Sequence, residues 1–297
     1  MNITLTGSLG HIGQPLTYRL LKQGHAVTVI STQEAKAKEI ISMGARAAIG
    51  TVEDPAFLAE AFSGADIVYC MEPPVDFFDK ELDIFAWYQK IAGNFVQAIL
   101  ASGVKQVVHL SSIGAHMASG NGLLRFHYEI EQIMQQLPDD VGITFMRPVG
   151  FYYNMLGFIH SIRSQGAIIS NYKAGYKEPW VAPSDIAAAI ADVMNHPVKG
   201  RSIRYVASEE LSGDDIAAIL GEAIGKPDLR WVTIPDEAML QGMMAAGMSH
   251  QAATGLVEMN AARQTGALAE DYFRNRPVLG ETKLKDFAAE FAAAYHK

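Results

Sequence analysis

Asn2-Ile3-Thr4-Leu5-Thr6-Gly7-Ser8-Leu9-Gly10-His11-Ile12-Gly13 opens the chain with a short apolar run, three glycines in the spacing GxxGxxG and the start of an amphipathic run. Gly7 would permit a tight turn after a strand, Gly10 would let backbone approach a diphosphate, and Gly13 would let a helix pack close to the strand. Unpaired N–H groups and the helix dipole would then hold the phosphates, with Leu9, His11 and Ile12 completing the loop. The pattern predicts dinucleotide binding. The alternative is a glycine-rich turn in an α/β fold that has lost its ligand.

Residues 1–150 alternate short β-branched runs with longer runs of helical period, as βα units that build a parallel sheet do. Strands are predicted over 2–6, 26–31, 46–49, 67–71, 106–111 and 142–147, and helices over 12–23, 33–43, 55–62, 80–102 and 124–137. Four of these helices are followed by a capping glycine, and Asp54-Pro55 has the form of an N-cap with proline in the first turn. The glycines are Gly24, Gly44, Gly64 and Gly103. The predicted fold class is α/β, with a doubly wound parallel Rossmann sheet.

In residues 151–297 the regular alternation of strands and helices ends, and short strand-like runs lie among helical runs. This pattern predicts a smaller, mostly helical lobe over the carboxyl ends of the sheet. Short strands are expected over 167–169, 204–206 and 229–234. Helices are expected over 152–163, 183–195, 212–224, 235–246, 249–263 and 283–295, of which 183–195 could pack back on the first domain. This second domain would cover the substrate.

Composition excludes several classes of protein. Of 297 residues, 49% are hydrophobic and 19% charged, and the formal net charge is −8 with no Lys/Arg run, so nucleic acid is not an expected partner. The single cysteine, Cys70, cannot form an internal disulfide, and no apolar segment approaches the ~20 residues that span a bilayer. The chain starts without a signal-like segment, so we expect a cytoplasmic protein with no membrane association.

The tip of the second predicted strand bears on which dinucleotide would bind. A carboxylate there would hold both ribose hydroxyls of NAD, but the tip is Ser31-Thr32-Gln33, and Glu34 is expected to lie too far into the following helix. Hydroxyls and an amide can accept a 2′-phosphate, with help from Lys36, although no arginine stands at the tip. NADP is therefore the expected cofactor, and NAD stays an alternative.

These motifs, together with segments spread along most of the chain, resemble the NmrA-like atypical short-chain dehydrogenases/reductases. The segments are Gly64-Ala65-Asp66-Ile67-Val68, Val107-Val108-His109-Leu110-Ser111-Ser112-Ile113-Gly114, Arg147-Pro148-Val149-Gly150-Phe151-Tyr152-Tyr153-Asn154 and Ala182-Pro183-Ser184-Asp185-Ile186-Ala187. That group includes quinone reductases, isoflavone-type reductases and redox-sensing regulators. The resemblance implies the fold and nucleotide binding, and leaves the substrate open.

The resemblance also implies further positions around the cofactor. Met71, Glu72 and Pro73 would border its ribose, Ser111 and Ser112 would face the nicotinamide, and Pro148, Val149 and Phe151 would form its wall. All of these lie at or just after the carboxyl ends of predicted strands, where open α/β sheets bind their ligands. The alternative for the two serines is that they bond the backbone of the next loop.

The usual catalytic pair of short-chain dehydrogenases, a Tyr followed four residues later by Lys, is incomplete here because Gln132 follows Tyr128 at that spacing. In the NmrA-like group a Lys or His precedes a Glu on the same helix, and by position that role falls to His127, with Glu131 on the same face. An imidazole with a pKa of about 6.5 could donate a proton at neutral pH. The alternatives are an ordinary surface histidine at His127, and Tyr128 as the proton donor.

Other candidates for chemistry are weaker. His109 lies in an apolar run and is expected to be a core histidine, whereas His116 lies in a loop and could approach a ligand. No histidines have metal-ligand spacing with a carboxylate, so no metal is predicted. No nucleophile-elbow motif supports hydrolysis.

The leading prediction is an NAD(P)H-dependent oxidoreductase that transfers hydride to an apolar carbonyl or a quinone. Aromatic and thioether side chains would suit a flat acceptor: Phe151, Tyr152, Tyr153 and Trp180, with Met239, Met243, Met244 and Met248 at helical spacing. These methionines could equally form a core or a homodimer face. One alternative function is a non-catalytic NAD(P)-binding redox regulator, and another is a nucleotide-sugar epimerase, which normally needs the intact Tyr–Lys pair.

Overall fold

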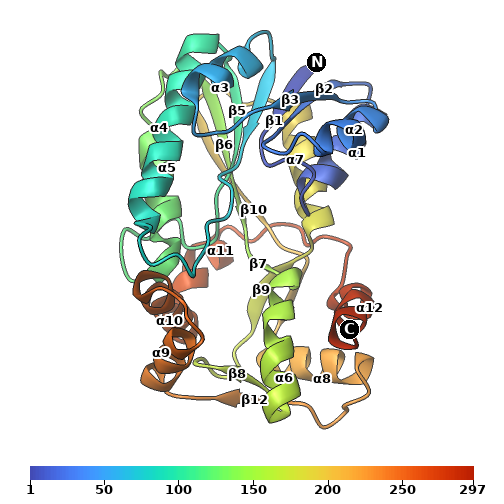
Figure 1. Cartoon of the computed structure of the whole chain (residues 1–297), viewed down its shortest axis with the longest axis vertical. Coiled ribbons are helices and arrows are strands. Elements are labelled where there is room, and N and C mark those ends of the chain that lie inside the picture. The colour runs from blue at the N-terminus through green and yellow to red at the C-terminus, as the bar shows by residue number, and fades with distance from the viewer.

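The computed structural model describes residues 1–297 and contains a seven-stranded sheet in the order β10-β6-β5-β4-β1-β2-β3, shown in Figure 1. Every neighbouring pair in it is parallel. The predicted doubly wound Rossmann sheet is therefore confirmed, with one strand more than expected. The strands are β1 (Asn2–Leu5), β2 (Ala26–Ser31), β3 (Arg46–Ile49), β4 (Ile67–Cys70), β5 (Gln106–Leu110), β6 (Gly142–Pro148) and β10 (Arg201–Val206).

Helices cover both faces of this sheet (Figure 1). One face packs on α1 (Gly13–Lys22), α2 (Lys36–Ser42) and α7 (Pro183–Asn195), and the other on α3 (Pro55–Phe62), α4 (Ile84–Ser102) and α5 (Arg125–Met134). Successive strand residues alternate between the two cores, so that Val107 joins the α4–α5 side and Val108 the α1–α7 side. Because both faces are covered, the strands are apolar throughout.

Local signals set most of the helix ends in this half. The four glycines expected after helices all have positive φ, and the Asp54 side chain accepts hydrogen bonds from the N–H groups of Ala56 and Phe57. The predicted helix over 80–102 begins too early. It starts at Ile84, because the Asp83 side chain caps it by accepting a bond from the N–H of Ala86.

Two further helices are also shorter than predicted. α2 begins at Lys36 rather than at residue 33, after a turn at 34–35. The helix expected over 124–137 is a 3₁₀ turn, η1 (Gly122–Leu124), followed by α5, which ends at Met134. Gly122 has a φ of +57° and packs so closely on α10 (His250–Thr265) that a Cβ would lie 2.0 Å from the Gly255 carbonyl oxygen.

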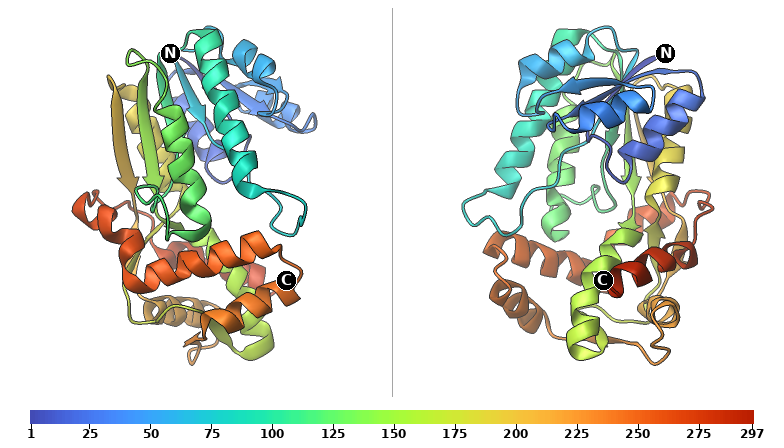
Figure 2. Two further views of the ribbon diagram at one scale, coloured as in Figure 1. Left: turned by 90° about the vertical axis from the view of Figure 1, so that its left-hand side faces the viewer. Right: turned by 45° about the vertical axis from the view of Figure 1, so that its right-hand side comes forward.

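The remaining elements form a second part of the molecule, the C-terminal lobe, which lies beyond the carboxyl ends of the main strands (Figures 1 and 2). It has its own core, in which Tyr152, Trp231 and Phe291 are buried. Its elements are β7 (Gly150–Phe151), η2 (Tyr152–Phe158), α6 (Ile159–Gln165), β8 (Ala167–Ser170), β9 (Glu178–Val181), β11 (Glu209–Leu211), α8 (Gly213–Ala223), β12 (Arg230–Thr233), α9 (Asp236–Ala245), α10, η3 (Ala267–Ala269), α11 (Glu270–Arg274) and α12 (Leu284–Tyr295).

Several predictions for this second half need correction. Residues 204–206 do not belong to the C-terminal lobe, because they form the end of β10, which pairs in parallel with β6 over its whole length. The helix expected over 152–163 is a 3₁₀ segment as far as Phe158, where Gly157 weakens helix formation, and becomes an α-helix only at Ile159. The short strands β7, β9 and β11 and the helix α11 were not predicted, because two to five residues carry too little periodicity.

None of the helices combines the length and the apolar character required to cross a membrane.

The loop between β4 and α4 reaches toward the C-terminal lobe, as Figure 2 shows. Two hydrogen bonds fasten it there: the N–H of Ser249 donates to the Phe77 carbonyl at 2.8 Å, and the N–H of Ile84 donates to the Gln251 side chain at 2.8 Å. Both bonds join this loop to the first turn of α10 and the residue before it.

The glycines after β1 allow α1 to start very close to the strand. A Cβ on Gly13 would lie 2.0 Å from the Ser8 carbonyl oxygen, a distance that no real contact allows. Gly7 has a φ of +87°, and a Cβ there would lie 2.4 Å from Cε of Met71. The tasks predicted for these two glycines, close packing and a tight turn, are both confirmed.

Gly13→Ala is expected to lower the free energy of unfolding by about 3 kcal/mol, because the added methyl group overlaps a backbone atom that cannot move away freely. Gly10→Ala is the matched control, since its Cβ would meet only the Gly7 carbonyl oxygen, at 3.5 Å, and should change stability by less than about 0.5 kcal/mol. Urea denaturation of both variants measures the difference. Equal losses would contradict the close-packing role of Gly13.

Candidate functional site

The loop after β1 is held in place by the end of β2. Ser8 has a φ of +55°, which is unusual for a residue other than glycine, and its N–H donates to the Ile30 carbonyl at 3.1 Å. The Ser8 hydroxyl donates to the Ser31 hydroxyl at 3.0 Å. These bonds turn the backbone of the loop toward the start of α1.

Four consecutive N–H groups at the start of α1 form no hydrogen bond within the protein: those of Leu9, Gly10, His11 and Ile12. No side chain caps the helix, and Gly10 and His11 are exposed. Free N–H groups at the positive end of a helix dipole bind anions. Because a Cβ on Gly10 would meet nothing nearer than 3.5 Å, an anion can approach the backbone here. The residues present therefore fit a diphosphate group.

Ser31 and Thr32, both expected to contact the cofactor, differ in their surroundings. Ser31 is buried, and its oxygen accepts bonds from the Ser8 hydroxyl and from the N–H of Gln33, so this hydroxyl orders the loop. Thr32 and Gln33 are exposed. Glu34 was expected inside the helix, but it lies exposed in the turn before α2. The Lys36 ammonium group lies 2.8 Å from the Glu39 carboxylate.

At the end of β4 the three candidate residues point in different directions. Met71 is half-buried and packs against Gly7, so it lies beside the glycine loop. Pro73 is half-buried as well. Glu72, expected to border the ribose, is buried, and its carboxylate lies 2.9 Å and 3.2 Å from Nε2 of His109. His109 is fully buried, which confirms the prediction of a core histidine.

The end of β5 is tied to a buried ion pair. The hydroxyl of Ser111 donates to the Glu131 carboxylate at 2.5 Å, instead of bonding the next loop. Two nitrogens of Arg147 donate to the two oxygens of the same carboxylate, at 2.9 Å and 2.7 Å. Burial by itself would lower the pKa of Arg147, but the bonds to Glu131 and its charge outweigh this effect and raise it. Glu131, expected on the same helix face as His127, therefore bonds to Arg147 and Ser111.

Arg147 extends this network into the C-terminal lobe. Its Nη1 donates to the Asp271 carboxylate at 3.1 Å and to the Tyr205 hydroxyl at 3.3 Å, and Tyr205 donates to Asp271 at 2.6 Å. Asp271 and Tyr205 were missed by the sequence analysis. Asp271 lies 124 positions after Arg147, and no local pattern marks such a partner.

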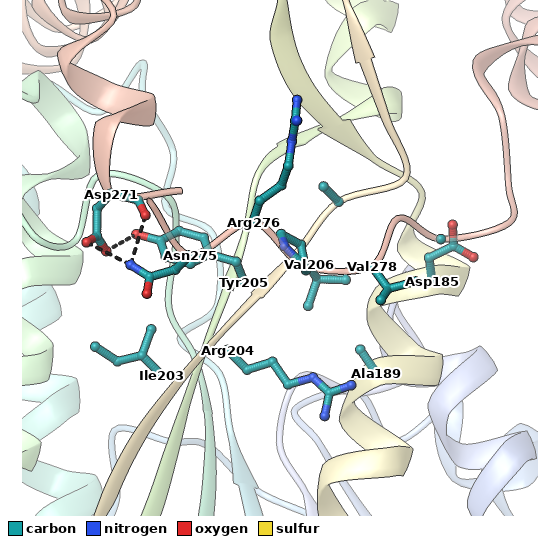
Figure 3. Close-up of a pocket in the computed structure, with 13 residues that line it drawn as sticks. Asp185, Ala189, Ile203, Arg204, Tyr205, Val206, Asp271, Asn275, Arg276 and Val278 are labelled. Carbon is teal, nitrogen blue, oxygen red and sulfur yellow. Dashed lines mark hydrogen bonds between the residues drawn. The ribbon is translucent and has the colours of Figure 1, made fainter. Parts of the chain in front are cut away.

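The outer end of this network faces a cavity of about 690 Å³ beside the edge strand β10, shown in Figure 3. Tyr205 and Asp271 line it, together with Arg204, Asn275 and Arg276. None of the residues predicted to bind a cofactor lines this cavity. It is separate from the glycine loop.

The aromatic segment after β6 meets the glycine loop. The His11 ring stacks on the Tyr153 ring with 4.5 Å between their centroids, and Phe151 lies 5.2 Å from Tyr153. Phe151 and Tyr153 are half-buried, Pro148 and Val149 are buried, and Ser112 is half-buried. The structure thus brings the segment after β6 and the loop after β1 together.

Two aromatic residues expected to cover a ligand are core residues instead. Tyr152 is fully buried, and its hydroxyl donates to Glu209 at 3.1 Å. Trp180 is only 4% exposed, and its ring packs on Gly150, where a Cβ would lie 2.9 Å from it. Their size and polarity alone did not distinguish a ligand wall from the core of the C-terminal lobe.

His127 and Tyr128 lie in the first turn of α5, which begins near the carboxyl ends of the strands because a crossover helix runs back along the sheet. The His127 ring is partly exposed, but its Nδ1 is buried and has no hydrogen-bond partner. Burial, and next the charge of His109, lower the pKa of His127 to about 3. The pKa expected from sequence therefore does not hold, and His127 is neutral at pH 7. Tyr128 is half-buried and makes no side-chain hydrogen bond.

Two further observations concern the remaining candidates. His116 is half-buried beside α11, and burial lowers its pKa. No three His, Cys, Asp or Glu side chains are arranged so that they could hold a metal ion.

Comparisons with known proteins agree with this architecture. A model described as the NmrA-like family matches residues 1–275. An NAD(P)H azoreductase of Xenophilus azovorans is 27% identical over 296 residues, which cover 99% of this chain and 99% of that protein. Among solved structures, triphenylmethane reductase of Citrobacter is 21% identical, covers 99% of this chain and 100% of its own, and superposes with a TM-score of 0.79. An NADPH-dependent quinone oxidoreductase of Escherichia coli, solved with NADPH, is 19% identical, with 97% and 99% covered and a TM-score of 0.77.

Glu131→Ala is expected to lower the free energy of unfolding by roughly 3 to 5 kcal/mol, because it leaves the Arg147 charge buried without its main partner. In chemical denaturation, adding Arg147→Met should recover part of this loss. Lys105→Ala breaks an exposed ion pair with Asp140 and should cost much less, because solvent screens both charges. If Glu131→Ala with Arg147→Met loses as much stability as the two single variants added together, the charges of Glu131 and Arg147 are not coupled.

The lowered pKa of His127 predicts a specific pH dependence of stability. Between about pH 6.5 and pH 3 the unfolded chain binds a proton at this residue and the folded chain does not, so stability falls as the pH falls. From pH 7 to pH 5 the protein should lose about 2 kcal/mol more than the variant His127→Gln. Urea denaturation at the two pH values measures this difference, and parallel losses would show that His127 titrates normally.

Proposed function

This chain belongs to the NmrA-like family, and on that basis we propose that it is an NADPH-dependent reductase of a flat, conjugated acceptor such as a quinone. The observation that carries the proposal is the row of four unbonded N–H groups at the start of α1. A buried or capped helix start offers no free N–H groups to a diphosphate. This helix start is uncapped, and an anion can approach it beside Gly10. When bound, the dinucleotide supplies a hydride.

We infer a preference for NADPH over NADH because neither β2 nor the two residues that follow it, Thr32 and Gln33, carry a carboxylate, and the first carboxylate, Glu34, comes only in the turn before α2. The exposed hydroxyl of Thr32 and the exposed amide of Gln33 can donate to a 2′-phosphate, and neither repels it. Ser31 supports this loop from below through its bond to Ser8. The E. coli quinone oxidoreductase is named as NADPH-dependent and was solved with NADPH, which supports this choice, whereas the name NAD(P)H azoreductase is compatible with either dinucleotide.

The other end of the cofactor would lie along the carboxyl edge of the sheet. Met71 and Pro73 border it from β4, while Val149 and Phe151 form a wall after β6. Residues 1–150, together with α7 and β10, make up the nucleotide-binding unit, and the C-terminal lobe covers the acceptor. Glu72 and Ser111 contribute to this edge indirectly, since their side chains bond to His109 and Glu131.

The acceptor side is apolar and adaptable. None of the residues of α9 is buried, although this helix carries Met239, Met243 and Met244. Phe78, which is 54% exposed, lies beside Gly247 just after this helix. Thioether and aromatic side chains adapt to flat apolar molecules, which supports a quinone-like acceptor. The printed names of the relatives, which concern azo compounds, triphenylmethane dyes and quinones, describe conjugated molecules as well.

A second candidate is a nucleotide-binding regulator without catalytic activity. The observation that favours it is that neither proton-donor candidate has an activating partner: Tyr128 lacks a following lysine, and His127 is neutral at pH 7. Such a protein would bind NADPH as tightly as a reductase would. Turnover with an acceptor separates the two functions.

Gly10→Val should weaken NADPH binding at least about tenfold, or 1.4 kcal/mol, because the added methyl groups stand where the diphosphate meets the backbone. Isothermal titration measures the affinity, and steady-state NADPH oxidation with a quinone measures the activity. Gly24→Ala is a control at a glycine far from the loop after β1. Unchanged affinity in Gly10→Val would contradict the proposed cofactor site. Tight NADPH binding without turnover of quinone, azo or triarylmethane acceptors would favour the regulator.

A further inference from the structure

A second cavity, of about 290 Å³, lies where the starts of α4 and α5 meet the start of α10 (Figure 2). Only one of the 11 residues that line it, Phe85, is hydrophobic. None of the residues assigned above to the cofactor or to the acceptor lines it. The cavity is therefore separate from the proposed reductase site, and its polar wall suits a small polar molecule.

Backbone N–H groups form one part of this cavity. Those of Ser119, Gly120, Asn121 and Gly122 make no hydrogen bond within the protein. Gly120 and Gly122 have φ angles of +76° and +57°, whereas Asn121 between them has a φ of −109° and a ψ of 10°. Backbone that alternates in this way turns successive N–H groups toward one point, where they bind an anion. Because all four residues line the cavity, the anion would lie inside it.

Arg125, at the start of α5, adds a full positive charge to the same cavity. Its Cζ lies 3.9 Å from the centroid of the Phe85 ring, and its Nε lies 3.0 Å from the carboxylate of Glu129. These two contacts hold the guanidinium group in place, while its two terminal nitrogens donate no hydrogen bond within the protein. A guanidinium group with free terminal nitrogens binds carboxylates strongly.

The cavity also contains oxygen atoms that an anion would leave unpaired. Nδ2 of the completely buried Asn121 donates to the carbonyls of Gly114 and Met117, both at 3.0 Å, but its Oδ1 is buried without a partner. A buried oxygen of this kind requires a donor. Glu258 of α10 lines the cavity without an ion-pair partner, and its backbone carbonyl carbon would lie 3.1 Å from a Cβ on Gly122. This carboxylate repels a simple anion and attracts a positive group.

We propose that this cavity is a binding site for a small polar amino acid. The α-carboxylate group lies against the N–H groups of residues 119–122 and against Arg125, and the α-ammonium group lies against Oδ1 of Asn121 and the carboxylate of Glu258. A zwitterion pairs both the unbonded donors and the unbonded acceptors, whereas a carboxylate alone or an amine alone pairs only one set. The polar wall favours a polar side chain over a large apolar one.

Isothermal titration at pH 7 with L-serine and, as a larger probe, L-asparagine tests this assignment. Two fragments of serine separate its charges: β-hydroxypropionate lacks the ammonium group, and ethanolamine lacks the carboxylate. Each fragment should bind at least about tenfold more weakly than L-serine, because each leaves one charged group of the cavity unpaired.

Substitutions test the two charged side chains. Arg125→Gln and Glu258→Gln should each weaken the binding of L-serine at least about tenfold. Both side chains are at least partly exposed, so both variants should fold. Arg274→Gln is the matched control, because Arg274 also pairs with a glutamate four positions away, Glu270, but lies outside the cavity. This control should bind L-serine as the wild-type protein does.

Backbone amide ¹⁵N shifts locate the bound molecule. Adding L-serine should move the signals of Ser119 and Gly120. The signals of Leu9 and Gly10, the other row of unbonded N–H groups, should not move. NADP⁺ should have the opposite effect on these two pairs of signals.

The outcomes decide this site independently of the reductase. If β-hydroxypropionate binds as tightly as L-serine, the cavity is a simple anion site and the amino-acid assignment is wrong. The assignment also fails if neither amino acid binds at millimolar concentration, or if Arg125→Gln binds L-serine as tightly as the wild-type protein does. A wild-type protein that binds L-serine at Ser119 and Gly120 but does not oxidise NADPH with any acceptor would support this site and contradict the proposed function alone.

Discussion

The buried ion pair between Glu131 and Arg147 holds the carboxyl edge of the sheet together. Its four atoms make two short bonds, and the same carboxylate also receives the Ser111 hydroxyl at the end of β5. Arg147 reaches onward to Asp271 in α11, so one guanidinium joins a helix, two strands and the C-terminal lobe. Burying these charges is costly unless every member is bonded. The carboxyl edge of the sheet therefore keeps its position only when Arg147, Glu131, Ser111 and Asp271 are all present.

The carboxyl edge divides into regions with different electrostatic character. At β1, backbone N–H groups and the dipole of α1 favour an anion without any basic side chain. At β4 and β5, Glu72 and His109 form a hydrogen-bonded pair that is buried away from water, and burial lowers the pKa of His127 so that its ring is neutral at pH 7. These two regions suit the two ends of a dinucleotide, because its diphosphate is charged while hydride transfer proceeds best in a water-poor environment.

The path of the chain explains why the sheet and the C-terminal lobe do not separate cleanly. After β6 the chain builds part of the lobe, returns to the sheet for α7 and β10, and leaves again to finish the lobe. Contacts between the sheet and the lobe are close: the N–H of Gly280 donates to the carbonyl of Ala207 at 2.8 Å, and a Cβ on Gly114, in the loop after β5, would lie 2.4 Å from Leu268. Figure 1 shows the chain passing between the two parts beside β7 and β10.

Local physics made the first half of this protein predictable. Strand-forming runs, capping glycines and the GxxGxxG spacing act over a few residues, so they set the elements, the parallel sheet and the loop around Gly10 without reference to the rest of the chain. The partners of the polar side chains could not be predicted in this way. Glu72 and His109 are 37 positions apart, and Arg147 and Asp271 are 124 apart. Whether Glu72 faces a ligand or a histidine, or His127 is charged or neutral, depends on desolvation and on charges that only long-range packing brings near.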